Sequence, residues 1–114
     1  MNSTDTPSTI SLDEPDELQG RSIEPVPGDE RYRFFAVKKK GRCYVYRNIC
    51  PHAGAPLNWG ADRFLTHDNQ FLLCSLHGAL FSIETGYCFA GPCKGFSLQA
   101  VPFEIRDNKI IIKC

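Results

Sequence analysis

The chain has 114 residues, 42% of them apolar, which is enough for one small domain with a modest hydrophobic core. No apolar run approaches the roughly 20 residues that a membrane-spanning helix needs, and the polar, acidic N-terminus does not resemble a secretory signal. We therefore expect a soluble, cytoplasmic protein without a membrane partner, whose six cysteines are more often ligands or buried thiols than disulfides.

Charge is divided unevenly, although the formal net charge is zero. Residues 1–30 carry eight acidic side chains and one base, a balance of −7, whereas residues 31–114 carry twelve bases and five acids, a balance of +7. The pattern favours solvated faces with a disordered leader, and a basic body that docks on an acidic protein partner is the alternative. Bases cluster only in residues 37–42, so nucleic acid is not an expected partner.

The predicted elements are short strands. Residues 1–17 contain few apolar groups and two prolines, so we expect a mobile acidic tail there and the folded domain over 18–114. An opening strand is predicted over 21–26. The turn at 38–41 joins strands over 31–37 and 42–48 in a hairpin.

The second half of the chain continues the strand pattern. Residues 71–76 are apolar and short, typical of a strand buried on both faces, and two further hairpins turn at 84–86 and at Asp107 and Asn108. Their strands are predicted over 79–83 with 87–90 and over 96–106 with 109–113. No stretch has ten residues of helical periodicity. The sequence predicts an all-β domain, either a small sandwich or an open barrel.

Two segments each combine a cysteine with a histidine. "CPHAGAPL" contains Cys50 and His52, and "CSLHGALF" contains Cys74 and His77. Two thiolates and two imidazoles suit either zinc or an iron–sulfur cluster. A zinc finger would group its cysteines apart from its histidines, whereas each segment here mixes them at the end of a predicted strand. Mixed loops can present both cysteines to one iron and both histidines to another.

The pattern C-x-H, 21 residues, C-x-x-H resembles the Rieske [2Fe-2S] signature, and the resemblance covers about residues 17–114. "ICPHAGAPL" and "CSLHGALFSIETG" are similar to the two cluster loops of Rieske ferredoxins, and "AGPC" at 90–93 to the glycine–proline loop that covers the cluster. The resemblance implies a Rieske-like fold of small antiparallel sheets with a cluster-binding subdomain of two loops. It also implies one [2Fe-2S] cluster per chain, with Cys50 and Cys74 on the inner iron and His52 and His77 on the outer one.

The flanking residues indicate a subtype within that family. Ala55 and Leu76 stand where respiratory Rieske proteins have disulfide cysteines, and Ala79 and Phe81 stand where those proteins have hydroxyl donors. The resemblance therefore implies a soluble ferredoxin of an oxygenase system, with a potential in the lower part of the range of about −150 to +300 mV. The connection between the two ligand pairs is longer than usual, with the extra length expected over 58–70.

Assignment of the cluster ligands leaves only His67, so a mononuclear iron site with two histidines cannot be built and no enzyme is expected. The resemblance implies a one-electron carrier between an NAD(P)H-dependent flavin reductase and a terminal oxygenase. The alternatives are a Rieske-like small subunit of a larger oxidoreductase, such as assimilatory nitrite reductase, and a zinc-loaded interaction module. Cys88 and Cys93 are expected to be reduced thiols, with a disulfide or a redox-active pair as the alternative.

Overall fold

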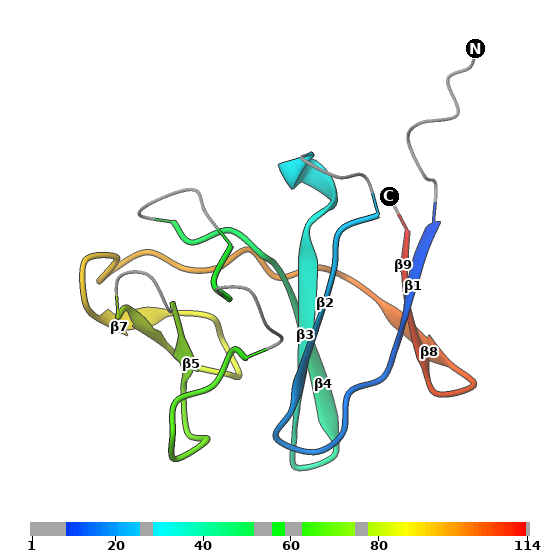
Figure 1. The fold of residues 1–114 in the computed structure, drawn as a ribbon, viewed down its shortest axis with the longest axis horizontal. Coiled ribbons are helices and arrows are strands. Elements are labelled where there is room, and N and C mark those ends of the chain that lie inside the picture. Colours follow the sequence, from blue (N-terminus) through cyan, green and yellow to red (C-terminus); the bar gives the residue numbers. More distant parts are fainter. Residues whose placement is uncertain (1–8, 26–28, 52–55, 59–62, 75–77, 114) are drawn as a thin grey trace.

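The computed structural model describes residues 9–25, 29–51, 56–58, 63–74 and 78–113. Within them, nine strands form three antiparallel sheets of three strands, in the orders β1-β9-β8, β2-β3-β4 and β5-β6-β7 (Figure 1). The strands are β1 (Thr9–Asp13), β2 (Gly20–Ile23), β3 (Phe34–Lys39), β4 (Arg42–Arg47), β5 (Leu72–Leu73), β6 (Leu80–Phe81), β7 (Cys88–Ala90), β8 (Glu104–Arg106) and β9 (Lys109–Lys113). A short 3-10 turn, η1 (Glu30–Tyr32), precedes β3. The prediction of an all-β fold of small antiparallel sheets is confirmed.

Two of the predicted hairpins close through two-residue turns. Lys40 and Gly41 join β3 to β4, and Asp107 and Asn108 join β8 to β9, all four with φ between 52° and 76°. Such turns match the right-handed twist of paired strands, and glycine, asparagine and aspartate tolerate the positive φ best. The turn residues therefore explain why these hairpins could be predicted locally.

The middle strand of the central sheet β2-β3-β4 contributes apolar side chains to a buried cluster on each face. Phe34 and Ala36 of β3 belong to a hydrophobic cluster shared with β1 and β9, whereas Phe35 and Val37 belong to a second cluster shared with the third sheet. Successive side chains of a strand point to opposite faces, so a continuous apolar run is what a strand between two layers requires. Figure 1 shows the central sheet between the other two.

Strand β1 lies where a mobile tail was expected over residues 1–17. Ile10 and Leu12 are buried, and β1 pairs along its whole length with β9. The alternation in "TISLD" is typical of a half-buried strand, but its partner lies about a hundred residues further on and gives no local signal. Residues 1–8 lie outside the described part of the chain.

Acidic residues that follow β1 contact the basic β3–β4 hairpin. Glu14 forms an ion pair of 2.6 Å with Lys38, and the Glu17 carboxylate accepts hydrogen bonds from the backbone amides of Lys40 and Gly41. Some of the acidic side chains in residues 1–30 thus interact with the basic hairpin of the same chain.

Two strands, in two different sheets, are shorter than the sequence predicted. Of the strand expected over 71–76, residues 71–74 are described, and only Leu72–Leu73 of these form β5. Strand β8, in the sheet with β1 and β9, covers only the end of the strand expected over 96–106. Ser97 and Ala100 instead make isolated bridges to Tyr87 and Tyr46, so this stretch crosses from the third sheet to the central one. Among the described residues, no helix has the length and apolar content needed to cross a membrane.

Candidate metal centre

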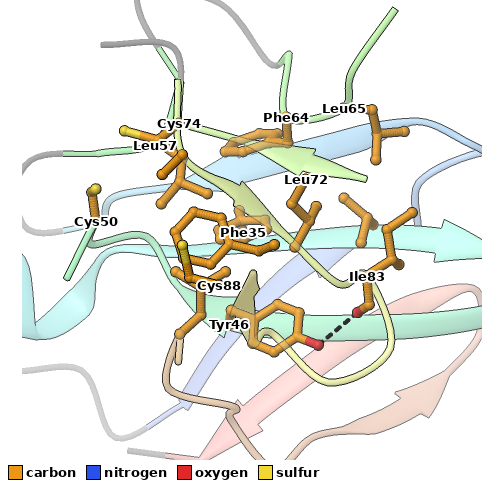
Figure 2. Close-up of a cluster of buried hydrophobic side chains, with 14 of the residues drawn as sticks. Phe35, Tyr46, Cys50, Leu57, Phe64, Leu65, Leu72, Cys74, Ile83 and Cys88 are labelled. Carbon is orange, nitrogen blue, oxygen red and sulfur yellow. Dashed lines mark hydrogen bonds between the residues drawn. The ribbon is translucent and has the colours of Figure 1, made fainter. Parts of the chain in front are cut away.

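Three loops each contribute a cysteine to one buried hydrophobic cluster, with residues 52–55 and 75–77 of these loops outside the described part of the chain. We call them the first loop (48–58), the second loop (74–79) and the third loop (91–96), which carry Cys50, Cys74 and Cys93. All three cysteines have no exposed surface and belong to the same hydrophobic cluster. In Figure 2, Cys50 and Cys74 lie on one side of this cluster and the Tyr46–Ile83 hydrogen bond lies on the other.

The first loop is held at both ends by Asn48. The side-chain oxygen of this residue accepts a hydrogen bond of 2.8 Å from the amide of Leu57, and its side-chain NH₂ donates to Asn58 Oδ1 at 2.9 Å. Its backbone N–H donates to the carbonyl of Arg33 at 2.9 Å. Asn48 is only 5% exposed, so its hydrogen bonds are largely shielded from water. Loss of one of them would leave a buried polar group without a partner and lower the stability of the fold. Sequence reasoning missed this residue.

Hydrogen bonds connect Cys74 to the described residues at the end of the second loop, Gly78 and Ala79. The Cys74 amide donates to the carbonyl of Ala79 at 2.9 Å, and the Gly78 amide donates to the carbonyl of Cys74 at 2.8 Å. Gly78 has φ of 71°, and a Cβ there would meet no atom within 4 Å. Glycine is therefore needed for its backbone conformation rather than for space. These bonds fix the position of the Cys74 backbone at the start of the loop.

The third loop packs directly on the second. A Cβ built on Gly91, whose φ is 93°, would lie 2.8 Å from Cα of Ala79, closer than any side chain could approach. The loop is closed by bonds from Lys94 N to the Gly91 carbonyl, 3.1 Å, and from Gly95 N to the Cys88 carbonyl, 3.0 Å. Glycine at position 91 thus allows the contact that brings the third loop against the second.

A sulfur–sulfur contact joins the third loop to the first. Sγ of Cys93 lies 3.5 Å from Sγ of Cys50, well beyond the bond length of about 2.05 Å in a disulfide. Cys88 is a free thiol whose S–H donates to the carbonyl of Ala90 at 3.2 Å. Cys88 and Cys93 therefore form no disulfide with each other in this structure.

The predicted ligands fall partly within the described residues. Cys50 and Cys74 are buried in the same hydrophobic cluster, whereas His52 and His77 lie outside the described part of the chain. Among the residues that are described, no three Cys, His, Asp or Glu side chains group as metal ligands. Two buried thiols on loops that share one apolar cluster fit the cysteine-ligated half of an iron–sulfur centre, where soft sulfur donors are shielded from water.

The neighbours of the predicted ligands are apolar. Ala79 and Phe81, which stand where hydroxyl donors were expected in a different subtype, have no exposed surface, and neither does Leu57. The third histidine, His67, is exposed and lies 3.2 Å from the Arg63 guanidinium, measured at Nδ1. The described neighbours of Cys50 and Cys74 are thus apolar and buried, and His67 lies apart from them on the surface.

Comparison with protein families gives one match across most of the chain. Residues 8–102 match the model of the Rieske [2Fe-2S] domain. A curated relative, the ferredoxin component of the alkene monooxygenase system of Xanthobacter autotrophicus, is 33% identical over 78 residues. The match covers 67% of this chain and spans only 57% of that relative.

Solved structures with the same fold include two ferredoxins. The ferredoxin of Sphingomonas yanoikuyae B1 superimposes with a TM-score of 0.63 at 24% identity, covering 87% of this chain and 90% of the other. The ferredoxin of carbazole 1,9a-dioxygenase from Nocardioides aromaticivorans IC177 gives a TM-score of 0.65 at 21% identity, covering 90% and 96%. At these identities the likeness concerns the fold.

Proposed function

Since the chain belongs to the Rieske [2Fe-2S] domain family, we propose that it is a one-electron carrier and not itself an enzyme. The cluster supplies a single reversible electron transfer when bound, and the protein determines its potential and its partners. The observation that carries the proposal is the burial of Cys50 and Cys74, the two cysteines of the motif, in the same hydrophobic cluster.

The proposed ligand set is Cys50 and Cys74 for one iron and His52 and His77 for the other. Two ferric ions and two sulfides together carry two positive charges, and the two thiolates cancel them. Neutral imidazoles add no charge, so the oxidised site is neutral overall. A site with four thiolates would start with two additional negative charges. Because adding an electron to a neutral site is easier, histidine ligation raises the potential.

Within the Rieske range, the surroundings favour a low potential. Ala79 and Phe81 are buried and carry no hydroxyl that could donate to a cluster or ligand sulfur. Hydrogen bonds to those sulfurs stabilise the reduced, more negative state. Their absence at these two positions supports the assignment to a carrier of low potential.

The proposed partners are an NAD(P)H-dependent flavin reductase and a terminal oxygenase. Two of the similar proteins are ferredoxins of oxygenases, one of an alkene monooxygenase system and one of a carbazole 1,9a-dioxygenase. Phe89, 36% exposed, lies shortly before the third loop, and Phe96, 63% exposed, is its last residue; both offer apolar surface for a transient contact near the centre. We propose the cytoplasm as the compartment, since the free thiol of Cys88 suits reducing conditions.

The proposal is tested by analysing the purified protein and following its reactions. We expect two irons and two acid-labile sulfides per chain, rapid reduction by a flavin reductase with NADH, and reoxidation by an oxygenase. Zinc in place of iron would overturn the proposal. So would a permanent complex with a catalytic subunit and no exchange as a carrier, the result expected of a nitrite reductase subunit.

A variant separates the ligand set from the fold. His77→Cys should retain a cluster with a lower potential, because the oxidised site then gains one negative charge. His67→Cys changes the one histidine outside the motif and should leave the potential unaltered. An equal potential in wild type and His77→Cys would contradict the role given to His77.

A further inference from the structure

Cys93 is placed to act on the proposed cluster through a ligand. Its side chain has no exposed surface, and its Sγ lies 3.5 Å from Sγ of Cys50. The third loop holds it there through the amide of Phe96, which donates to the Cys93 carbonyl at 2.9 Å, and through the contact of Gly91 with Ala79. The position of Cys93 is therefore determined by backbone hydrogen bonds and packing.

The chemistry of the ligand identifies which sulfur donates. By geometry, either thiol could be the donor in the Cys50–Cys93 contact. A cysteine that ligates iron is a thiolate and has no proton to give. If Cys50 is a ligand, as proposed above, the hydrogen bond can run only from the Cys93 S–H to the Cys50 sulfur.

We propose that Cys93 is a potential-setting residue, which donates an S–H···S hydrogen bond to Cys50 and so raises the reduction potential of the cluster. The added electron makes the site more negative and increases the charge on the ligand sulfurs. A donor aimed at one of them stabilises the reduced state more than the oxidised state. One electron is gained, and the Cys93 proton stays on its own sulfur. This donor acts from the third loop, whereas positions 79 and 81 provide none.

The chain offers a matched control for this hydrogen bond. Cys88 lies five residues earlier and is equally buried, but its thiol donates to the backbone carbonyl of Ala90 at 3.2 Å. Cys88→Ala and Cys93→Ala remove the same number of atoms from the same hydrophobic cluster. A difference between them therefore reports the sulfur–sulfur contact rather than lost packing.

The experiment measures the reduction potential of each variant by spectroelectrochemical titration. We expect Cys93→Ala to shift to lower potential, Cys88→Ala to stay with the wild type, and Cys93→Ser, which retains a donor, to lie above Cys93→Ala. A Cys93→Ala potential at or above that of the wild type would overturn the proposal. So would equal shifts in Cys93→Ala and Cys93→Ser.

The amount of cluster bound by each variant shows whether a failure concerns this inference, which rests on the proposed function, or the proposed function itself. If Cys93→Ala holds a full cluster at an unchanged potential, the donor role fails and the ligand set stands. If Cys93→Ala and Cys93→Ser both lose the cluster while Cys88→Ala retains it, Cys93 is a ligand and the donor role is also overturned. Full loading of Cys50→Ala would contradict the proposed function itself.

A second measurement detects the proton directly. Electron–nuclear double resonance on the reduced cluster, before and after exchange into D₂O, should show an exchangeable proton coupling in the wild type and in Cys88→Ala. This coupling should be missing from Cys93→Ala. Identical couplings in all three proteins would rule out the hydrogen bond from Cys93.

Discussion

The side-chain oxygen of Asn48 accepts a hydrogen bond of 2.8 Å from the backbone amide of Leu57, nine residues further along the chain. Asn48→Ala leaves this buried amide without a partner, which costs about 1–3 kcal/mol in free energy of unfolding. Chemical denaturation of the cluster-free protein measures the loss. The same variant should also release iron faster, because the first loop is no longer held at its ends.

An exposed amide serves as the control for Asn48. Gln99 lies on the surface, and Gln99→Ala removes a similar side chain there. We expect its free energy of unfolding to stay within about 0.5 kcal/mol of the wild type. Equal losses in the two variants would mean that the Asn48 bonds do not stabilise the loop.

The buried hydroxyl of Tyr46 leads us to expect a loss of folding stability at alkaline pH. Its hydroxyl donates to the Ile83 carbonyl at 2.6 Å, and burial raises the pKa of Tyr46 from 10.0 to about 12. The unfolded chain thus releases this proton at lower pH than the folded chain does. The stabilisation is complete below pH 10.0 and is lost as pH rises toward about 12.

Tyr46→Phe tests both parts of that expectation. At neutral pH, the variant should lose about 1 kcal/mol of unfolding free energy, because the Ile83 carbonyl loses its donor. Above pH 10.0, its stability should fall less steeply than that of the wild type. Tyr87→Phe, at a residue 46% exposed, is the control. Parallel pH profiles of the wild type and Tyr46→Phe would be evidence against the assignment.

The hydrogen-bonded carboxylate of Glu17 leads us to expect a loss of folding stability at acidic pH. Hydrogen bonds from the amides of Gly41 and Lys40, with a contribution from the Lys38 charge, lower the pKa of Glu17 below its ordinary value of 4.5. The stabilisation is present above pH 4.5 and is lost as pH falls through the lowered pKa. Glu17→Gln should be less stable than the wild type at neutral pH and should depend less on pH below 4.5. Asp16→Asn, at an exposed neighbour, should follow the wild type in thermal unfolding across this range.

Ala79→Ser introduces a hydroxyl at the second loop. If the hydroxyl reaches a cluster or ligand sulfur, the reduced state gains a donor and the potential rises. Ala100→Ser, at an exposed position, should leave the potential unchanged. Film voltammetry compares the three proteins. A potential for Ala79→Ser that matches Ala100→Ser would show that position 79 does not face the sulfur atoms.

The sequence predicted those parts of the fold whose signals are local. Glycine and asparagine at the two hairpin turns can be interpreted without knowing the rest of the chain, as can the apolar run of β3. Strand β1 was missed because Ile10 and Leu12 pair with β9, at the far end of the chain. The predicted strand over 96–106 proved short because residues 97–100 bridge two different sheets.

In the candidate site, too, the sequence predicted the residues with a local pattern and missed those that depend on the folded structure. Residue types and spacing indicated Cys50 and Cys74, because thiolates in that pattern have few other uses. Asn48 was missed because a single polar residue before a loop has no distinctive pattern, although an asparagine two residues before a candidate ligand could have suggested an anchor. The approach of Cys93 to Cys50 joins residues 43 positions apart and depends on how the third loop packs.

The most direct test of the central claim is the ⁵⁷Fe Mössbauer spectrum of the oxidised protein. The proposed ligation, by Cys50 and Cys74 on one side and His52 and His77 on the other, makes the two irons chemically different. The spectrum should contain two quadrupole doublets of equal area, one for an iron with only sulfur ligands and one for an iron with nitrogen ligands. A single doublet, or a protein without iron, would contradict the account.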